Sequence, residues 1–516
     1  MTLVGNPILP GCHPDPSICR VGGEYFLVTS TFEYLPGLPI HRSSDLSRWE
    51  LIGHAIDRPG MLDMSGMASS RGLYAPTLRH HGGRFWLICT LVDQNDAARG
   101  GNFVITAPDP AGPWSDPVWL DVDGIDPSLF FDDDGRAWAH GTRPARAPQW
   151  HDQTEVWLRE FDPVAMALIG PEHLLWRGAV IGGVWAEGPH IYKVDGRYLL
   201  VAAEGGTEMN HAVMVARADA VTGPYLGDPA NPVLSHRQLG RTADVVAVGH
   251  ADLVEAEDGT WWAVLLGMRP YGGLHANLGR ETFLVPVVWE DGWPVFAPGS
   301  GRVPETVEVP FGRTGVADDG SVVVAPGDLR WTSVRALPGE VADAVGEEWL
   351  LPVRAEGPLD AQPFAFLGLR QQHIDVDVSL RITGRLAEGE EGGLLIRQSE
   401  RDHVRLAVLG GGEADAARVT LTLVRRGETV ELGVATLEGS LADGVELACR
   451  ARGQDYELLA GTRANPPRRV ATIDGRSLDS FSSGGFLGLW LGVYATSSGQ
   501  ETESVLRVGN VQYRAR

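Results

Sequence analysis

The stretch His13-Pro14-Asp15-Pro16-Ser17-Ile18, followed by Gly22-Gly23-Glu24-Tyr25-Phe26-Leu27-Val28, decides the fold of this chain. It reads as a short apolar strand, a glycine turn, and a second strand rich in aromatic and β-branched residues, which is the pattern of a β-hairpin. The pattern returns four more times, with turn glycines at positions 23, 83, 135, 196 and 259. Successive turn glycines are 60, 52, 61 and 63 residues apart.

Repeats of this length with several short strands in each unit predict a β-propeller, whose innermost strands line a central channel. Five copies of the pattern predict five blades within residues 1–305. Residues 306–329 are rich in Gly, Pro and Val and are predicted to be a linker. Short strands with alternating apolar and polar residues follow over 330–516 and predict an antiparallel, jelly-roll-like β-sandwich. Because helical periodicity is weak throughout, we expect an all-β chain.

Three acidic residues stand at the same phase of the repeat, since Asp15, Asp126 and Glu187 each open the first apolar strand of a unit. His250 holds the corresponding place in the last unit. A propeller would gather these side chains at one mouth of its channel. Converging carboxylates suggest acid–base chemistry, most simply on a glycosidic bond.

A purely structural interpretation of these residues competes with the catalytic one. Asp-Pro-Ser is a common turn sequence, and a lone histidine is more often a hydrogen-bonded core residue. The shared phase favours function, because several polar groups at one channel mouth are costly unless they are paired or used.

The overall charge narrows the class of partner. The chain has 67 acidic and 43 basic residues, for a net charge of −24. This balance disfavours nucleic acid and anionic membranes as partners, and it suits a small neutral ligand.

The sequence also carries signals of location. The amino terminus lacks the features of a secretory signal, and no apolar run is long enough to span a bilayer. Cysteines at positions 12, 19, 89 and 449 lack metal-type spacing, which indicates reduced thiols and predicts a cytoplasmic protein. A disulfide between Cys12 and Cys19 is the alternative.

Several motifs occur in an order that resembles a known family. They include the segments from Asn6 to Ile18, from Phe32 to Trp49, from Gly72 to Arg79, from Gly124 to Phe130, from Glu187 to Lys193, from Gly249 to Leu253 and from Leu278 to Phe283. Together they resemble glycoside hydrolase family 43, in the group of β-xylosidases and α-L-arabinofuranosidases with a carboxy-terminal β-sandwich. The resemblance spans almost the whole first domain and is looser in the second.

The resemblance implies a five-bladed propeller and hydrolysis with inversion. It implies Asp15 as the general base, Glu187 as the general acid, and Asp126 as the residue that positions the acid and tunes its pKa. Arg280 matches an arginine near the substrate, and His250 matches a histidine at the channel centre. Inversion by two carboxylates requires no cofactor, although in some members this histidine helps to hold a calcium ion.

Three aromatic residues are candidates for the substrate pocket. Phe32 lies in a family motif, and Tyr74 stands where the family often has tryptophan, so that substrate choice is open there. In related enzymes a sandwich loop reaches over the propeller and narrows the site. Phe486 in Gly484-Gly485-Phe486-Leu487-Gly488 is the candidate from that loop, and a buried sandwich residue is its alternative role.

The expected function is release of terminal xylose from β-1,4-xylo-oligosaccharides during xylan degradation. The close alternative is an α-L-arabinofuranosidase that removes arabinose from arabinoxylan or arabino-oligosaccharides, or an enzyme with both activities. A non-catalytic carbohydrate-binding propeller would have lost a catalytic carboxylate, and a retaining fructosidase would carry an Asn-Asp-Pro-Asn type motif, which is absent. The expected partner is a small oligosaccharide, and a homo-oligomer stays open.

Overall fold

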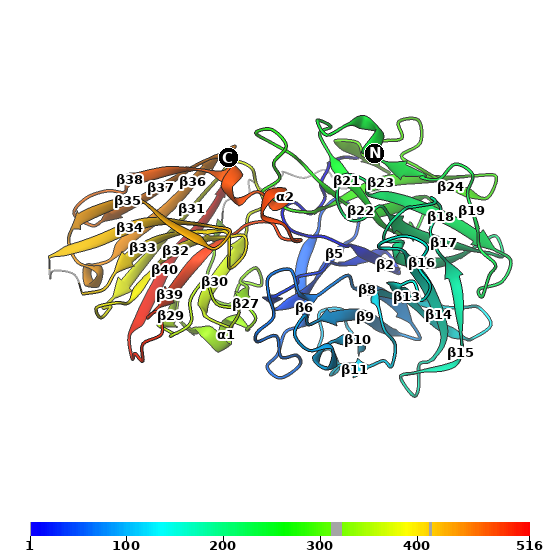
Figure 1. Ribbon diagram of the computed structural model, residues 1–516, viewed down its shortest axis with the longest axis horizontal. Coiled ribbons are helices and arrows are strands. Elements are labelled where there is room, and N and C mark those ends of the chain that lie inside the picture. The colour runs from blue at the N-terminus through cyan, green and yellow to red at the C-terminus, as the bar shows by residue number, and fades with distance from the viewer. Residues whose placement is uncertain (1, 311–321, 412–414) are drawn as a thin grey trace.

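The computed structural model describes residues 2–310, 322–411 and 415–516, and it consists almost entirely of β-strands. Two bodies lie side by side, a propeller built from the first part of the chain and a β-sandwich built from the rest (Figure 1). The prediction of an all-β chain, with a propeller followed by a sandwich, is confirmed.

Five antiparallel sheets make up the propeller in the described residues. The first contains β2 (Ser17–Val21), β3 (Glu24–Val28), β5 (Gly37–Ser43) and β6 (Glu50–Ile56); the second β7 (Gly72–Leu73), β8 (Thr77–His81), β9 (Arg84–Val92), β10 (Gly101–Ala107) and β11 (Val118–Trp119); the third β12 (Ile125–Phe131), β13 (Ala137–Pro144), β14 (Thr154–Asp162) and β15 (Ala167–Trp176); the fourth β16 (Glu187–Val194), β17 (Arg197–Glu204), β18 (Ala212–Ala218), β19 (Leu226–Gly227) and β20 (Leu234–Ser235); the fifth β21 (Val246–Glu255), β22 (Trp261–Met268), β23 (Glu281–Glu290) and β24 (Trp293–Phe296).

The sheets form a closed ring. The innermost strands contact one another in the order β2, β8, β12, β16 and β21, and β21 returns to β2. The amino-terminal segment fastens onto the fifth sheet, where the amide of Asn6 exchanges hydrogen bonds with the backbone of Leu284 at 2.8 and 2.9 Å. Strand β1 (Thr2–Gly5) also pairs with β25 (Thr306–Val309), which follows the fifth sheet. Inner blade strands such as β9 are buried on both faces, because neighbouring sheets cover them.

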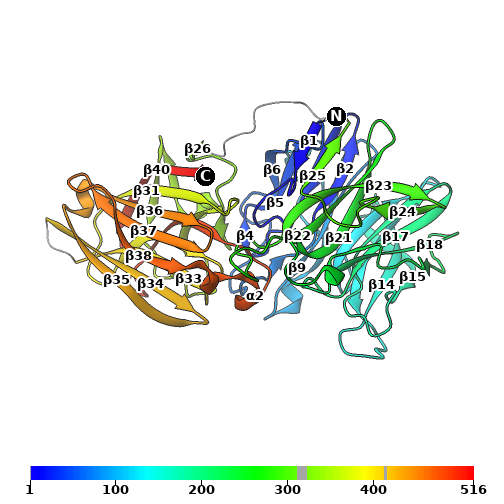
Figure 2. The ribbon, with the colours of Figure 1, turned by 90° about the horizontal axis from the view of Figure 1, so that it is seen from above.

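The carboxy-terminal body is a sandwich of two antiparallel sheets (Figure 2). One contains β26 (Val322–Val323), β28 (Asp343–Val345), β29 (Glu348–Pro352), β31 (Val376–Gly384), β36 (Val445–Arg452), β37 (Asp455–Thr462), β38 (Arg468–Asp474) and β40 (Val505–Ala515); the other contains β30 (Ala365–Arg370), β32 (Glu391–Arg397), β33 (His403–Leu409), β34 (Ala416–Arg425), β35 (Glu428–Glu438) and β39 (Trp490–Thr496). Short helices connect the strands: α1 (Pro338–Val341), α2 (Ser480–Ser483), η1 (Ala97–Arg99), η2 (Arg237–Leu239), η3 (Leu441–Asp443) and η4 (Gly475–Leu478).

The two bodies share an interface that is partly a sheet and partly an apolar core. Strand β27 (Ser333–Val334) pairs with β4 (Tyr34–Leu35) of the propeller segment. The ring of Tyr34 stacks on that of Trp490 with centroids 3.8 Å apart. The predicted linker, 306–329, includes β25 and β26, and its residues 311–321 lie outside the described residues.

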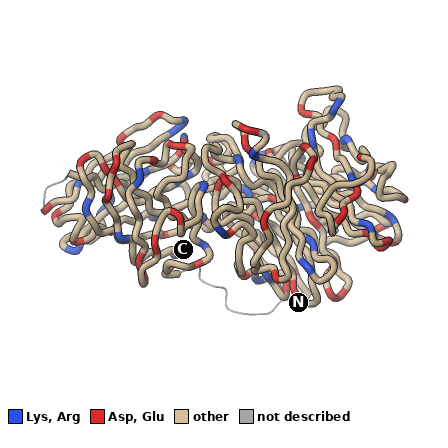
Figure 3. The backbone as a smooth tube through the Cα atoms, turned by 90° about the horizontal axis from the view of Figure 1, so that it is seen from below, with Lys and Arg blue, Asp and Glu red and all other residues tan. Residues whose placement is uncertain are grey.

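Charge, membrane signals and thiols complete the description. Acidic and basic residues are interspersed along both bodies (Figure 3). No helix in the described ranges is long and apolar enough to cross a membrane. All four cysteines are buried and free, so the alternative disulfide between Cys12 and Cys19 is not formed.

Candidate functional site

A cavity of about 550 Å³ opens at one end of the propeller channel. All eight residues that the sequence singled out line it: Asp15, Phe32, Tyr74, Asp126, Glu187, His250, Arg280 and Phe486. Seven of these come from the propeller, and Phe486 comes from the loop between α2 and β39 of the sandwich. Residues up to 471 positions apart in sequence therefore meet in one site.

Local backbone distortions aim the polar side chains at this cavity. Asp15, Asp126 and His250 adopt left-handed φ values of 55°, 51° and 53°. The register of the innermost strands also shifts at Asp126, Glu187 and His250. Bulges of this kind turn a side chain out of the alternation of a strand. Positive φ is costly for a non-glycine residue, and at these three positions the cost coincides with a side chain that faces the cavity.

Asp15 is buried and held as a carboxylate. Its Oδ1 lies 2.9 Å from Nη1 of Arg280 and 3.9 Å from Nδ1 of His250, and its Oδ2 accepts a hydrogen bond from Ser30 at 2.5 Å. Burial by itself would raise the pKa of Asp15, but Arg280, His250 and Ser30 together hold that pKa below its usual value. Asp15 is therefore ionised at neutral pH and can accept a proton.

Glu187 is in the opposite state. It opens β16, and burial together with the charges of Asp126 and Asp15 raises its pKa well above the usual range, against the opposing effect of Arg280. A carboxylic acid in this environment keeps its proton near neutral pH and can donate it. The two carboxyl groups therefore suit a base and an acid within one cavity.

The pKa of Asp126 is raised, but less than that of Glu187. Its Oδ2 accepts a hydrogen bond from the N–H of Gly188 at 3.1 Å, directly after Glu187. Burial, followed by the charge of Asp15 and opposed by His250, raises the pKa of Asp126 to about 6. Gly188 itself has φ +56°, and a Cβ there would lie 2.8 Å from the His250 ring, so only glycine fits.

Aromatic rings form one wall of the cavity. Phe32 and Phe486 stack with centroids 5.5 Å apart, and Tyr74 meets them edge-on at 5.5 and 5.9 Å. The guanidinium carbon of Arg280 lies 5.4 Å from the Phe32 ring and 5.0 Å from the Phe486 ring. Phe486 is thus a cavity residue contributed by the sandwich, and it is half-buried.

The cavity includes residues that the sequence did not mark as site residues, among them Arg71, Trp185, Thr207 and Glu208. Arg71 and Trp185 adjoin recognisable motifs, because they lie beside Gly72-Leu73-Tyr74 and Ala186-Glu187. The Thr207 hydroxyl oxygen accepts a hydrogen bond from Nη1 of Arg280 at 3.0 Å, yet nothing in the local sequence of Thr207 sets it apart. Only the folded chain identifies it.

A polar network closes the channel beneath the cavity, and each innermost strand contributes to it. Arg79 of β8 donates to Oδ2 of Asp252 in β21 at 2.8 Å and lies 3.0 Å from Nδ1 of His190 in β16. Ser17 of β2 donates to Asp252 at 2.6 Å, and Ser128 of β12 lies 3.1 Å from the same His190 nitrogen. Burial would raise the pKa of Asp252, but Arg79 holds it well below the usual range.

Two carboxylates close to His250 are already engaged by arginines and so offer little free coordination to a calcium ion. Calcium takes six to eight oxygen ligands. The nearest carboxylate, Asp15, is already paired with Arg280, and Asp252 is paired with Arg79. Across residues 2–310, 322–411 and 415–516, no group of three or more His, Cys, Asp or Glu is placed to hold a metal.

Known proteins resemble this chain over almost its whole length. The model of "Glycosyl hydrolases family 43" matches residues 4–294, and that of "Beta xylosidase C-terminal Concanavalin A-like domain" matches residues 328–514. A xylosidase/arabinosidase of Butyrivibrio fibrisolvens is 38% identical over 98% of both chains. A non-reducing end α-L-arabinofuranosidase of Bacteroides ovatus is 36% identical over 96% of this chain and 92% of its own. The crystal structure of a xylan β-1,4-xylosidase from Bacillus halodurans superposes with a TM-score of 0.90 at 31% identity, covering 99% of this chain and 100% of that one.

Proposed function

This chain belongs to glycosyl hydrolases family 43 and is a glycoside hydrolase, and we propose that it releases terminal xylose from β-1,4-xylo-oligosaccharides with inversion. The observation that carries the proposal is the pair of carboxyl groups with opposed environments in one cavity. Asp15 is held ionised by Arg280, and Glu187 is held protonated by burial and by neighbouring negative charge.

In the proposed reaction, Asp15 removes a proton from a water molecule, and that water attacks the anomeric carbon from the face opposite the leaving group. Glu187 gives its proton to the glycosidic oxygen as the bond breaks. Asp126 keeps the pKa of Glu187 high and, through the Gly188 N–H, fixes the strand from which Glu187 projects. The sugar leaves with inverted anomeric configuration.

The shape of the cavity supports action at a chain end. Phe486 lies over the propeller mouth and narrows the cavity with Phe32 and Tyr74. A pocket closed on one side holds a single terminal sugar better than the middle of a polymer. Small oligosaccharides are therefore the proposed substrates.

Removal of α-L-arabinofuranose is the second candidate. Tyr74 leaves this choice open, because it fills the wall position with a smaller ring than tryptophan, and its hydroxyl accepts a hydrogen bond from Arg71 at 2.6 Å. A Bacteroides ovatus relative with 36% identity also bears the name of an arabinofuranosidase. Both sugars present similar hydroxyl groups to a pocket, and one site can accept both.

We further propose that the reaction needs no metal ion, because Asp15 in the cavity and Asp252 in the channel already pair with arginines. A cytoplasmic location stays a proposal as well. The four buried free thiols support it, since such thiols persist in a reducing compartment.

The test measures hydrolysis of an aryl β-D-xyloside and an aryl α-L-arabinofuranoside side by side, with Asp15→Ala as the control. Faster hydrolysis of the xyloside that disappears in Asp15→Ala supports xylose release. The reverse preference selects the arabinofuranosidase. Proton NMR of the first product shows whether its anomer is inverted, and retention would contradict the proposed base.

A further inference from the structure

We propose that Arg397 of the sandwich is a positioning residue for the active site, and that it acts through Glu33, Ser70 and Phe486 on the Arg280–Asp15 ion pair. This inference rests on the proposed function, in which Asp15 is the general base. It assigns to the sandwich a part in the chemistry of the propeller.

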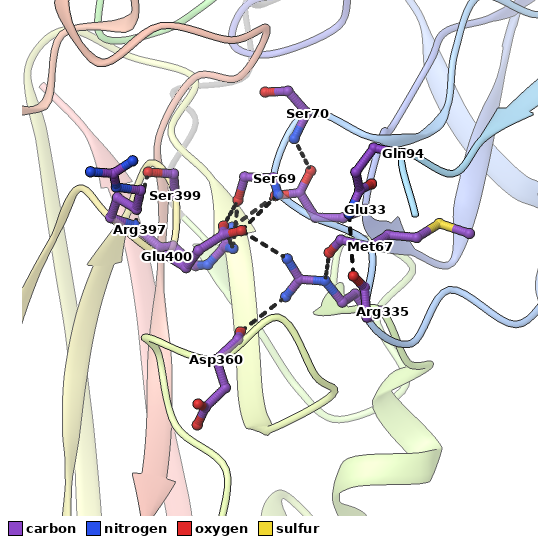
Figure 4. Close-up of polar contacts among 12 residues, drawn as sticks. Glu33, Met67, Ser69, Ser70, Gln94, Arg335, Asp360, Arg397, Ser399 and Glu400 are labelled. Carbon is purple, nitrogen blue, oxygen red and sulfur yellow. Dashed lines mark hydrogen bonds and ion pairs between the residues drawn. The ribbon is translucent and has the colours of Figure 1, made fainter. Parts of the chain in front are cut away.

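Arg397 lies at the end of β32 and is completely buried against the propeller (Figure 4). Its Nη1 donates to Oε1 of Glu33 at 3.1 Å and to the hydroxyl of Tyr34 at 2.8 Å. Its Nη2 donates to Ser69 at 2.9 Å and to Glu400 at 3.3 Å. The Glu33 side chain is also fully buried, so each charge depends on the other across the domain interface.

The second oxygen of Glu33 continues the connection within the propeller. Glu33 Oε2 accepts a hydrogen bond from the N–H of Ser70 at 2.9 Å, while the N–H of Ser69 donates to Glu400 at 2.9 Å. Ser70 has φ +65°, and Phe32, directly before Glu33, has φ +52°. Such backbone is costly without glycine and persists only where surrounding contacts fix it. The buried ion pair supplies those contacts.

A second arginine of the sandwich holds the same segment. Arg335 has φ +61°, its N–H donates to the carbonyl of Glu33 at 2.7 Å, and its Nε donates to the carbonyl of Met67 (Figure 4). Its Nη2 lies 3.4 Å from Glu400. The segment that leads to Ser70 is therefore anchored to the sandwich at Met67 and at Ser69.

Ser70 passes this anchoring to the loop that covers the cavity. Its hydroxyl accepts a hydrogen bond from the N–H of Phe486 at 2.8 Å, and its carbonyl accepts one from the Tyr74 hydroxyl at 3.1 Å. Gly485 has φ +86°, and a Cβ there would lie 2.4 Å from Oγ of Ser70. The close approach that glycine permits fixes where Phe486 stands.

Phe486 in turn supports the arginine of the ion pair. The Arg280 guanidinium lies over the rings of Phe486 and Phe32, with its carbon 5.0 and 5.4 Å from their centroids. Its Nη1 reaches Oδ1 of Asp15 at 2.9 Å. A guanidinium is attracted to ring faces, so the two rings set its position. Contacts thus run without a break from Arg397 to Asp15.

A simpler role for Arg397 would be to join the two domains. That role predicts lower stability in a variant, with the chemistry unchanged per folded molecule. The positioning role predicts more. If Arg280 moves away from Asp15, the pKa of the base rises, and the acidic limb of the kcat/KM profile moves to higher pH.

The experiment compares Arg397→Met and Ser70→Gly in the full chain. Ser70→Gly keeps the left-handed backbone and removes only the hydroxyl that Phe486 uses. Arg405→Met is the matched control for the first variant, because Arg405 pairs with Glu391 within the sandwich at 2.7 Å. Ser498→Gly is the control for the second, since Ser498 is exposed and has φ +53°.

We expect kcat/KM to fall roughly tenfold to a hundredfold in Arg397→Met and Ser70→Gly, with the acidic limb at higher pH, and to stay near wild type in both controls. A lower melting temperature with unchanged kcat/KM and pH profile would overturn the proposal. If Arg397→Met fails to fold, Ser70→Gly decides alone.

Failure of the proposed function is recognised separately, because wild-type protein would then be inactive or Asp15→Ala would remain active. A crystal structure of Ser70→Gly then answers the question without activity. Loss of the Phe486–Arg280 contact supports the positioning role, and an unchanged contact contradicts it.

Discussion

The N–H of Gly188 donates to Oδ2 of Asp126 across two neighbouring sheets at 3.1 Å. Gly188 directly follows Glu187, so this hydrogen bond fixes the strand bulge from which the proposed acid projects. Asp126 therefore acts on Glu187 in two ways. It holds the backbone beside it, and its charge helps to raise the pKa of the Glu187 carboxyl.

Replacing Asp126 should change the pH dependence of catalysis. Asp126→Asn removes a negative charge that raises the pKa of Glu187, so that pKa falls and the basic limb of the pH profile moves to lower pH. The amide oxygen of asparagine still accepts from Gly188, which keeps the backbone in place. Asp132→Asn is the control, because Asp132 pairs with Lys193 and Tyr198 away from the cavity. A basic limb that does not move would contradict this role.

Loss of the proposed acid should depend on the leaving group. Glu187→Ala should slow the hydrolysis of oligosaccharides and of aryl glycosides with poor leaving groups about 10²- to 10⁴-fold. Hydrolysis of activated aryl glycosides should slow much less, because their leaving groups need little protonation. The measurement is kcat/KM for a series of aryl glycosides with falling phenol pKa. Glu255→Ala, an exposed glutamate at the end of β21, should leave every member unchanged. Equal losses across the series would argue against Glu187 as the acid.

Chelation should leave the activity intact. Asp15 and Asp252 are paired with Arg280 and Arg79, so the cavity and channel already hold the positive charges that a cation would supply. We expect the same kcat/KM after dialysis against EDTA and after addition of calcium. Titration calorimetry with calcium should show no binding at the site. Activity that is lost with EDTA and restored by calcium would refute this expectation.

The network in the channel should contribute to stability. Asp252→Asn leaves the Arg79 cation in the channel without its carboxylate, and loss of one partner of a buried pair costs about 3–5 kcal/mol. Denaturant unfolding of the full chain measures the cost, and Asp258→Asn, in an exposed turn, is the control. A loss no larger than that of the control would show that the pair contributes little.

The same ion pair predicts how stability depends on pH. Arg79 lowers the pKa of Asp252 in the folded state. The contribution of this ion pair to the free energy of unfolding is therefore complete above the unfolded pKa of Asp252, about 3.9, and is lost as pH falls below that value. Wild type and Asp252→Asn should therefore converge in stability at acidic pH. A constant difference between pH 7 and pH 3 would contradict this assignment.

The repeat could be predicted from the sequence because each unit is a continuous stretch of the chain. Turn glycines and alternating apolar residues recur within short windows, and each blade is built from neighbouring strands of the chain. The shared phase of Asp15, Asp126 and Glu187 followed from the same repetition. The sequence could not predict that Thr207 lines the cavity, because the segment between β17 and β18 carries no repeated pattern.

The sequence by itself determined an all-β propeller followed by a sandwich, together with the positions that converge on the channel mouth. Only the tertiary structure decided that Phe486 stacks on Phe32, that Arg280 rests on both rings beside Asp15, and that Arg397 is buried against Glu33. The physical reason is the separation in sequence between the residues that make each contact. Periodicity reports which residues share a face of one strand, whereas packing between domains joins residues hundreds of positions apart, and no local pattern records it.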